Sequence, residues 1–462
     1  MNNSIDGLKT DLYELTMAAG YFQNGVKLHG CFELSCYSMP KNRSYLVACG
    51  LEQIVDYILN LRFSEDDIQF LKRHPVFQSV RPDFFDYLKR FRFRGDVWAM
   101  PEGEIFFASE PLIQVDAPIV EAQILETYLL STLNIASLVA TKASRVVKAA
   151  TYDGVKRGVV DFGSRRAHGS HAAILAARAA YIGGCLGTSN VYAGKAFGIP
   201  LYGTMAHSWV EAFDQEEESF RKYHAVFPAS TVLLIDTYDS LQAITKIIRS
   251  DLGRTIKGVR LDSGDLEILS KKVRKMLDEG NLQHVKIIAS GNLNEYKILD
   301  LVKRKAPIDT FGVGTDMVTS RDLPALNLTY KLVQIHHPEQ GIKFKAKRSV
   351  RKRTIPGRKQ VFRHYTRKGF FAKDVLGLFG ERPAERAEPL LKPVIEKGKL
   401  KKALPSVAEI RDYTQLRLLQ LPSSFLNPER RCPFKTQLSE EISRIKICNY
   451  SGTHIHREPD CR

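Results

Sequence analysis

The sequence has few cysteines, and their spacing does not indicate a disulfide scaffold or a zinc ribbon. The seven cysteines are scattered over 462 residues, and no two of them form a Cys-x-x-Cys pair. Disulfide-rich domains and zinc ribbons both need closely spaced, mostly paired cysteines. An odd number of scattered cysteines therefore indicates free thiols in a reducing compartment.

Long apolar runs and a leader sequence are also lacking. No uninterrupted apolar run approaches the roughly 20 residues of a membrane span. Asp6, Asp11 and Glu14 stand where a signal peptide would carry basic and then apolar residues. We therefore expect a cytoplasmic protein without a membrane partner. The apolar share of 44% is ordinary for a globular chain, and the length suggests roughly two to four domains.

The net charge of +17 lies at one end of the chain. Residues 331–462 hold 30 Lys and Arg against 13 Asp and Glu, whereas residues 1–330 hold 38 of each kind. Thirteen basic residues without an acid lie between Lys343 and Lys373. Such a run can bind nucleic acid, which is one hypothesis for the chain. Because it lacks regularly interleaved aromatics and adjoins a neutral body, we favour a solvated face or a field that attracts anionic substrates, and no nucleic-acid partner.

The hydrophobic pattern divides the chain into three parts. Residues 1–115 predict an N-terminal α+β domain, with a helix over 11–22 capped by Thr10. Residues 116–330 predict a βα barrel-like catalytic domain, and residues 331–462 a basic region that packs with the N-terminal domain. The other elements expected at the two ends are a strand over 30–37, a helix over 51–61, strands within 95–115, strands over 330–335 and 359–365, and a helix over 436–447.

The middle part alternates short apolar runs with helical segments. Strands are predicted over 158–162, near Cys185, and over 199–203, 231–235, 257–261, 285–289 and 310–313. Helices are predicted over 120–150, 170–181, 209–223, 240–248, 266–277 and 293–303. Strands that are apolar throughout and alternate with helices indicate a parallel α/β sheet. Six or seven such units favour an irregular (β/α) barrel over an open sheet.

Polar residues follow six of these strands. The carboxyl ends of parallel strands meet at one edge of a sheet, so these residues should form one site. The segments are 163–168, 204–207, 236–237, 262–265, 290–292 and 314–316. Arginines, acids and glycine-rich turns at one edge suit a phosphorylated substrate with a divalent metal.

The glycine-rich turns have a physical rationale. Ser290-Gly291-Asn292 and Ser263-Gly264-Asp265 lie between a strand and a helix, where free backbone N–H groups can hold phosphate. Taken singly, such turns are as often simple helix caps. Gly312-x-Gly314-Thr315 lacks the third glycine of a dinucleotide fingerprint, which argues against Rossmann-type binding.

Acids and arginines follow several strands. Asp236 and Asp262 are either N-caps or a pair that shares Mg²⁺ and ribose hydroxyls. Arg165, Arg166 and Arg260 are either solvated or bind carboxylate or phosphate through bidentate forks.

His207 also follows a predicted strand. A lone histidine at such a place is usually structural. Beside arginines and acids in a phosphate site, a neutral imidazole could instead act as a general base or accept a phosphoryl group.

Six motifs stand in an order that resembles the nicotinate phosphoribosyltransferase family. They are Thr10-Asp11-Leu12-Tyr13-Glu14-Leu15-Thr16-Met17, Asp161-Phe162-Gly163-Ser164-Arg165-Arg166, Gly203-Thr204-Met205-Ala206-His207-Ser208, Arg260-Leu261-Asp262-Ser263-Gly264-Asp265, Ala289-Ser290-Gly291-Asn292-Leu293 and Gly312-Val313-Gly314-Thr315. The resemblance spans about residues 8–375, including residues 356–363 of the basic run. It implies the type II phosphoribosyltransferase fold, an irregular (β/α) barrel with an additional α+β domain built from the N-terminal and C-terminal parts.

The resemblance implies a reaction in which nicotinate, phosphoribosyl pyrophosphate and ATP give nicotinate mononucleotide, pyrophosphate, ADP and phosphate. This is the first step from nicotinate to NAD, with Mg²⁺ as cofactor. His207 would be the phosphorylated residue. Tyr13 and Phe162 would enclose the pyridine ring, with Tyr13 coming from the partner subunit of a homodimer with shared active sites.

The resemblance also assigns the remaining site residues. Arg165, Thr204 and Arg260 would hold nicotinate. Asp236 and Asp262 would contact ribose or Mg²⁺. Phosphoribosyl pyrophosphate would be bound by Arg260, Asp262, Gly291, Gly314 and Thr315.

Ser189 bears on the choice of substrate. The related nicotinamide enzymes place an aspartate after Gly-Thr, whereas here Gly187-Thr188 is followed by Ser189. An aspartate would repel the carboxylate of nicotinate and a serine can donate to it, so the acid is favoured. A nicotinamide enzyme and an inactive homologue stay as alternatives. Quinolinate phosphoribosyltransferase, a third relative, decarboxylates its substrate and is generally shorter.

Residues from about 449 onward match nothing in the family. Cys448, His454, His456 and Cys461 could in principle bind zinc, but their spacing is not that of a standard finger. We favour an irregular tail.

Overall fold

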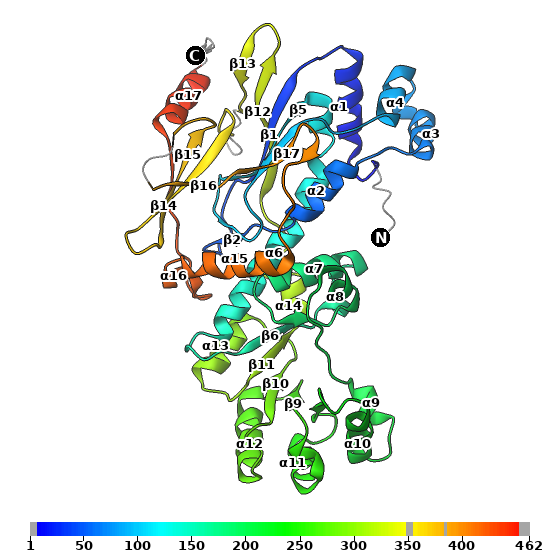
Figure 1. Ribbon diagram of the computed structural model, residues 1–462, viewed down its shortest axis with the longest axis vertical. Coiled ribbons are helices and arrows are strands. Elements are labelled where there is room, and N and C mark those ends of the chain that lie inside the picture. The colour runs from blue at the N-terminus through cyan, green and yellow to red at the C-terminus, as the bar shows by residue number, and fades with distance from the viewer. Residues whose placement is uncertain (1–6, 348–353, 383–385, 452–462) are drawn as a thin grey trace.

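A computed structural model describes residues 7–347, 354–382 and 386–451 of the chain. Of the tail residues considered for zinc, His454, His456 and Cys461 lie outside the described residues, as does the side chain of Cys448. Figure 1 shows an upper part built on antiparallel sheets and a lower part built on a parallel sheet, with α6, α7 and α15 where the two meet.

The helices of the upper part and of the boundary are α1 (Leu12–Gln23), α2 (Leu51–Asn60), α3 (Glu65–Arg73), α4 (Pro82–Lys89), α5 (Ile119–Gln123), α6 (Glu126–Ala150), α7 (Ser170–Ile182), α15 (Val407–Leu419), α16 (Ser423–Leu426) and α17 (Glu440–Ser451). Those of the lower part are α8 (Val191–Phe197), α9 (His207–Glu211), α10 (Glu216–Val226), α11 (Ser240–Arg249), α12 (Leu266–Glu279), α13 (Glu295–Lys303) and α14 (Thr315–Val318). Short 3₁₀ helices are η1 (Pro75–Phe77), η2 (Ser164–Arg166) and η3 (Asp251–Arg254).

The largest antiparallel sheet joins strands from both ends of the chain. Its order is β13 (Gly341–Phe344), β12 (Leu328–His337), β1 (His29–Cys36), β5 (Pro111–Pro118), β3 (Asp96–Ala99), β17 (Lys392–Glu396) and β18 (Lys399–Leu400). A second sheet holds β16 (Glu388–Pro389), β14 (Lys359–Tyr365), β15 (Phe371–Leu378) and β19 (Thr436–Leu438), and β2 (Leu46–Val47) pairs with β4 (Ile105–Phe106). Because β12 pairs with β1 and β17 with β3, the last third of the chain packs against the first.

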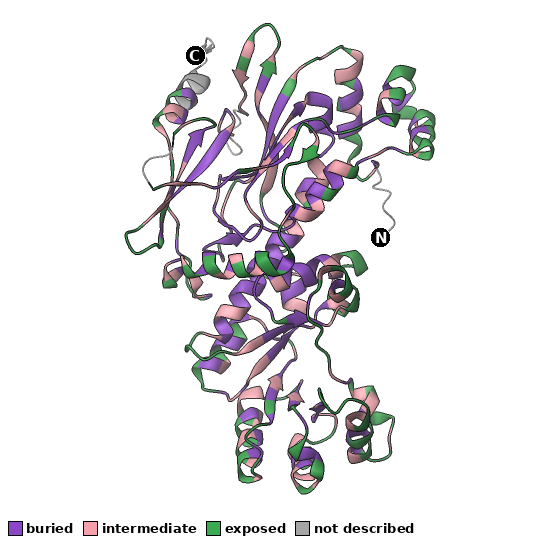
Figure 2. Ribbon diagram, viewed as in Figure 1, coloured by how far each residue is buried: buried purple, intermediate pink, exposed green. Residues whose placement is uncertain are grey.

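The lower part contains a six-stranded parallel sheet. Its order is β7 (Gly187–Thr188), β6 (Gly158–Asp161), β11 (Thr310–Val313), β10 (Lys286–Ala289), β9 (Gly258–Leu261) and β8 (Val232–Leu234). This is the circular order of a barrel, opened between β7 and β8. Among the described residues no strand pairing spans that opening, so the closed barrel is not confirmed, whereas the parallel α/β sheet is. Figure 2 shows these strands as largely buried, as apolar parallel strands require.

The run over 199–203 was wrongly predicted as a strand. Only Leu201 makes a bridge, to Thr188, in the opening between β7 and β8. The predicted helix over 209–223 is likewise two helices, α9 and α10, separated by residues 212–215. Polar residues Asp214 and Gln215 lie in that break, and Gln215 occupies the N-cap position of α10 without a side-chain capping hydrogen bond.

Two predictions at the ends of the chain also need correction. The N-cap of α1 is Asp11 rather than Thr10, whose hydroxyl donates instead to the Glu14 carboxylate. The predicted helix over 436–447 begins with strand β19, which pairs with β15, and only then becomes α17.

Helix α6 is the central helix of the molecule. Although no uninterrupted run predicts a membrane span, residues 119–150 are long and apolar enough to form one by length and composition. In the structure 61% of the most apolar window is buried inside the protein, and α6 packs on α7 and α13 (Figure 1). This is the burial expected of a core helix.

A buried ammonium group in α6 connects distant segments. Lys142 is 1% exposed, and its Nζ lies 2.7 Å from Glu295 Oε2 and 2.8 Å from Asp322 Oδ1. The same amine lies 3.7 Å from Asp316 Oδ1, and Arg43 pairs with Asp322 at 2.8 Å. Buried charges are tolerated only when they are paired, so these acids must converge on α6.

A second buried ionic cluster joins the antiparallel sheets to α15. Arg363 of β14 is fully buried and donates two hydrogen bonds to Asp374, at 3.0 and 2.6 Å. Its Nη1 donates to Glu104 Oε1 at 2.7 Å, and Arg417 Nε of α15 donates to the same oxygen at 2.8 Å. Arg363, one of the thirteen cations of the basic run, is therefore a structural residue.

We expect Arg363→Met to lower the free energy of unfolding by about 3–5 kcal/mol, because it leaves buried carboxylates without their counter-charge. Thermal and urea unfolding followed by circular dichroism measure this. Arg81→Met is the control, since Arg81 forms an exposed pair with Asp83 and should cost less than about 1 kcal/mol. Equal effects of the two substitutions would contradict the structural role.

Candidate active site

The arginine at the end of β9 is the centre of the predicted site. Arg260 Nε donates to Ser290 Oγ at 2.9 Å, and its Nη2 donates to Asp262 Oδ1 at 2.9 Å. Its Nη1 donates to Thr204 Oγ1 at 2.6 Å and to the Met205 carbonyl at 3.2 Å. The structure therefore brings together the ends of β9 and β10 and the segment before α9, as the parallel sheet predicts.

The two predicted aspartates are adjacent. Asp236, after β8, accepts hydrogen bonds from the Asp262 backbone N–H at 3.0 Å and from Ser263 Oγ at 2.5 Å, both through Oδ2. Its Oδ1 is buried and has no hydrogen-bond partner among the described residues. An unpartnered buried carboxylate oxygen is costly, so this atom can accept a cation or a hydroxyl donor.

Asp262 is held in its charged form. Burial raises the pKa of its carboxyl, but hydrogen bonds from Ser290 and Arg260, with the positive charge of Arg260 and the proximity of His207, bring the net pKa below the usual value. A carboxylate with four lone-pair sites therefore stays ionised at the strand ends. Groups of three or more His, Cys, Asp or Glu with metal-site spacing are absent from the part of the chain that the structure describes.

His207 begins α9 and is partly buried. Its Nδ1 lies 3.1 Å from Thr237 Oγ1, and Thr237 directly follows Asp236. The ring is close enough to Asp262 to affect the pKa of that carboxyl. No contact of Nε2 is recorded among residues 7–347, 354–382 and 386–451, so this nitrogen can meet a ligand.

An aromatic ring forms one wall of the site. The Phe162 ring centroid lies 5.8 Å from Arg260 Cζ. A Cβ on Gly312 would lie 2.4 Å from that ring, so glycine is required for Phe162 to pack there. A Cβ on Gly314 would approach the Phe162 carbonyl to 3.2 Å. The two glycines of β11 and its turn thus lie directly against the ring and backbone at the end of β6.

The end of β7 lies beside the end of β6. Thr188 Oγ1 donates to Asp161 Oδ2 at 2.7 Å, and the Ser189 backbone N–H donates to the Asp161 carbonyl at 2.9 Å. Burial raises the pKa of Asp161 more than its hydrogen bonds from Thr188 and Gly163 lower it. This pairing places Ser189 next to Phe162 along the same edge.

Two arginines predicted for the site are exposed and make no recorded side-chain contact among the described residues. Arg165 and Arg166 form η2 directly after Phe162 and Gly163. They stand at the correct strand end but, unlike Arg260, are not fixed by protein groups. Thr315 begins α14 after Gly314 and is partly buried.

Tyr13 is not brought to the strand ends of its own chain. It is 45% exposed on α1, in the upper part of Figure 1, far from β9 and β10. The next residue anchors the helix: Glu14 accepts hydrogen bonds from the backbone and hydroxyl of Thr127, at 2.9 and 2.6 Å. Burial raises the pKa of Glu14 to about 7.

Residue-by-residue reasoning included Ser290 and Thr237 among the polar strand ends but did not assign their contacts, and it missed Lys142. Ser290 Oγ donates to Asp262 Oδ1 as well as accepting from Arg260, and Thr237 contacts His207. Both belong to the polar strand ends but are adjacent to more conspicuous residues. Lys142 pairs with Glu295 at the start of α13, yet nothing in an apolar helical pattern distinguishes it.

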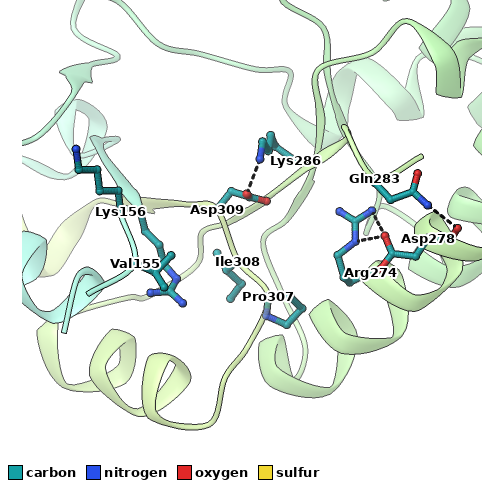
Figure 3. A pocket seen from close by; sticks show the side chains of 10 residues that line it. Val155, Lys156, Arg274, Asp278, Gln283, Lys286, Pro307, Ile308 and Asp309 are labelled. Carbon is teal, nitrogen blue, oxygen red and sulfur yellow. Dashed lines mark hydrogen bonds and ion pairs between the residues drawn. The ribbon is translucent and has the colours of Figure 1, made fainter. Parts of the chain in front are cut away.

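A cavity elsewhere on the lower part does not compete with this site. It has a volume of about 380 Å³ and lies at the opposite, amino ends of β6, β10 and β11 (Figure 3). Lys286 pairs there with Asp309, and Arg274 with Asp278, at 3.1 and 2.8 Å. Arg157 pairs with Asp153, so apart from Lys156 the lining charges are neutralised and leave little to attract an ionic substrate.

Three family models match successive parts of the chain. The N-terminal domain model of nicotinate phosphoribosyltransferase matches residues 8–134, the nicotinate phosphoribosyltransferase family model residues 158–371, and the C-terminal domain model residues 383–446. A nicotinate phosphoribosyltransferase of Mycobacterium tuberculosis is 42% identical over 423 residues, which cover 90% of this chain and 88% of that protein. One from Bacillus subtilis is 38% identical over 469 residues, covering 95% and 94%.

Solved structures agree with the sequence matches. Human nicotinic acid phosphoribosyltransferase superposes with a TM-score of 0.82 at 28% identity, covering 94% of this chain and 99% of that chain. Nicotinate-nucleotide pyrophosphorylase from Pyrococcus furiosus gives a TM-score of 0.73 at 27% identity, covering 91% and 97%. The fold class implied by the motifs is thereby confirmed, apart from closure of the barrel.

The turn after β10 requires a glycine. Gly291 has a φ of +95°, and a Cβ there would lie 2.0 Å from the Asp262 carbonyl oxygen. Alanine at this position already pays for the left-handed backbone conformation. We expect Gly291→Ala to add a steric cost of about 1–3 kcal/mol, which lowers the melting temperature and displaces Asp262.

Gly154→Ala is the matched control, because its φ is +83° and nothing lies within 4 Å of the added Cβ. Differential scanning calorimetry compares the two variants. A Gly291→Ala protein that melts no lower than Gly154→Ala would show that the turn can relax.

Proposed function

The chain belongs to the nicotinate phosphoribosyltransferase family, and we propose that it transfers the phosphoribosyl group of phosphoribosyl pyrophosphate to the ring nitrogen of nicotinate. The products are nicotinate mononucleotide and pyrophosphate. The observation that carries this proposal is the position of Arg260, held by Thr204, Ser290 and Asp262 and facing the Phe162 ring. It places a fixed cation beside an aromatic wall, which suits an aromatic carboxylate.

Nicotinate binds against Phe162 in this proposal. The ring face positions the pyridine, and Arg260 with Thr204 and exposed Arg165 supplies donors for its carboxylate. Ser189, beside Phe162 on the same edge, adds a hydroxyl where a carboxylate would repel the substrate. These side chains orient the nitrogen for attack on the ribosyl carbon.

Tyr13 acts from a second copy of the chain. Its own α1 is far from the strand ends, and Leu12, Tyr13 and Met17 are exposed on that helix, at 49%, 45% and 38%. We therefore include a homodimer with shared active sites in the proposal. Three large apolar side chains exposed to water on one helix are unfavourable in a monomer, and burying them in a dimer interface removes that cost.

Mg²⁺ and phosphoribosyl pyrophosphate fit the other half of the site. Asp236 has a buried oxygen without a partner and Asp262 is ionised, and Mg²⁺ in proteins is commonly held by one or two carboxylates together with substrate phosphates. When bound, the ion neutralises charge on the departing pyrophosphate. Gly291, Gly314 and Thr315 offer backbone N–H groups to the phosphates, and Arg260 with Asp262 contacts the ribosyl part.

His207 couples ATP hydrolysis to the transfer. With Nδ1 held by Thr237, Nε2 attacks the terminal phosphorus of ATP, forming an N–P bond as the P–O bond to ADP breaks. Water later cleaves the N–P bond, giving phosphate and the free imidazole. Asp236 and Asp262 lie beside His207. A change of charge on the His207 ring therefore changes the electrostatic potential at the carboxylates that contact the ribosyl group.

The proposal includes the division into residues 1–115, 116–330 and 331–462, a cytoplasmic location, and no nucleic-acid or membrane partner. The described basic residues of the run support the last point. Lys359 pairs with buried Glu33 at 2.6 Å and Arg358 with Asp116 at 3.0 Å, so several of these cations hold sheets together.

We expect the purified protein to form nicotinate mononucleotide from nicotinate, phosphoribosyl pyrophosphate and Mg²⁺, faster with ATP. Nicotinamide replaces nicotinate in a parallel reaction, and products are separated by chromatography. Turnover of nicotinamide but not of nicotinate would refute the assignment and favour the nicotinamide enzyme. Removal of Mg²⁺ with a chelator should abolish product.

We expect His207→Ala to turn over at the same rate with and without ATP, because the group that accepts the phosphoryl is gone. His284→Ala, an exposed histidine before β10, is the control and should keep ATP stimulation. Labelling with γ-³²P ATP checks the covalent step, with acid-labile label expected in wild type and control only. Retained ATP stimulation in His207→Ala would exclude the phosphohistidine.

A further inference from the structure

A second cluster of positive charge lies in the upper part, remote from the strand ends. Between α4 and β3, arginines alternate with buried phenylalanines, so their guanidinium groups share one exposed face. A pocket of about 390 Å³ opens on that face. Its lining residues are Tyr87, Arg90, Phe91, Arg92 and Arg94.

Among the described residues, a carboxylate neutralises one of these three arginines, Arg94. The Arg94 backbone N–H and Nε donate to buried Glu121, at 2.7 and 2.8 Å. Arg90 Nε donates only to the Asp86 carbonyl, at 3.2 Å, and Arg92 Nη1 to the Phe91 carbonyl, at 2.6 Å. No ion pair of Arg90 or Arg92 is recorded in the described ranges, so two guanidinium groups line the pocket with their charge uncompensated.

Arg62 lies near the pocket, because the ring of the next residue, Phe63, packs against the lining residue Phe91 with ring centroids 5.9 Å apart. Arg62 Nη1 donates to the Leu61 carbonyl at 2.6 Å and forms no recorded ion pair among the described residues. Burial and the charge of Arg92 lower the pKa of Arg62. Like charges held together without a counter-ion cost free energy, and a bound anion removes that cost.

The β17–β18 turn carries further positive charge. Gly398 lies so close to the chain before β3 that a Cβ there would be 2.2 Å from the Phe93 carbonyl oxygen, and its N–H donates to the Gly95 carbonyl at 2.9 Å. Lys397 and Lys399, on either side of Gly398, are exposed. The turn that carries these two lysines therefore packs against the chain between Phe93 and Gly95, and Asp96 Oδ1 accepts the Lys397 backbone N–H at 2.7 Å.

We propose that this pocket binds the phosphate chain of a di- or triphosphate anion. Guanidinium forks match phosphate oxygens, and Arg90 and Arg92, which line the pocket without a recorded ion pair in the described ranges, suit a ligand that carries several negative charges. The pocket is large enough for such a chain. Figure 1 shows α4 in the upper part, far from β9 and β10 of the same chain, so this pocket is separate from the site at those strand ends.

Inorganic polyphosphates and nucleotides share this chemistry. The test titrates the full-length protein with tripolyphosphate by isothermal titration calorimetry. Wild type is compared with an Arg90→Gln/Arg92→Gln variant, which removes two lining charges, and with an Arg73→Gln/Arg81→Gln control. The control removes the same charge from α3 and the start of α4, outside the pocket.

We expect one class of sites to weaken at least about tenfold in the pocket variant and to persist in the control. Turnover of nicotinate should stay unchanged in both. Indistinguishable isotherms for wild type and the pocket variant, or an equal loss in the control, would overturn the proposal, since binding would then lie elsewhere or reflect net charge alone.

Competition identifies the source of the anion. Pyrophosphate and ATP should both displace tripolyphosphate from the pocket-dependent class, and adenosine should not. Displacement by adenosine, or binding of ATP without binding of tripolyphosphate, would show that the pocket recognises a nucleoside and would refute a phosphate-chain site.

Discussion

The buried ammonium of Lys142 is the constraint on which the two parts of the molecule depend. An ammonium group in the interior is stable only with carboxylates around it, and here they come from α13, α14 and the segment after it. Glu295 and Asp316 stand immediately beyond the turns that hold Gly291 and Gly314. One side chain of α6 therefore sets where both turns lie, and Arg43, through Asp322, extends the same constraint to the antiparallel part.

Much of the site could be predicted because its residues are local to strand ends. Asp236, Asp262 and Arg260 follow from the alternation of strands and helices, and the structure brings them together. The sequence could not locate Tyr13, whose placement depends on how whole sheets pack. The strand predicted over 199–203 was wrong for a related reason. An apolar run predicts burial, but a strand also needs a neighbouring strand in register, and here only Leu201 makes a bridge.

The net charge illustrates the difference between composition and placement. Arg363 and Lys359 belong to the most basic run, yet both are buried and paired with acids of the first third of the chain, Glu104 and Glu33. Such partners are hundreds of residues apart and leave no periodic signal. Conversely, Arg90 and Arg92 belong to the neutral body of the chain but line a pocket without a recorded ion pair among the described residues. Formal charge by segment therefore says little about where an anion binds.

The opening between β7 and β8 has a mechanical consequence. Each interior strand is fastened by ladders on both sides, whereas the backbone of the segment before α9 is joined to β7 by the pairing of Thr188 with Pro200 and Tyr202. Displacing that segment breaks few ladder bonds, and its ties to the site run through the Arg260 side chain and through the hydrogen bond between His207 and Thr237. The segment that leads to His207 is therefore the part of the sheet edge that moves most easily. The side chains of Arg260 and Thr237 hold it in place.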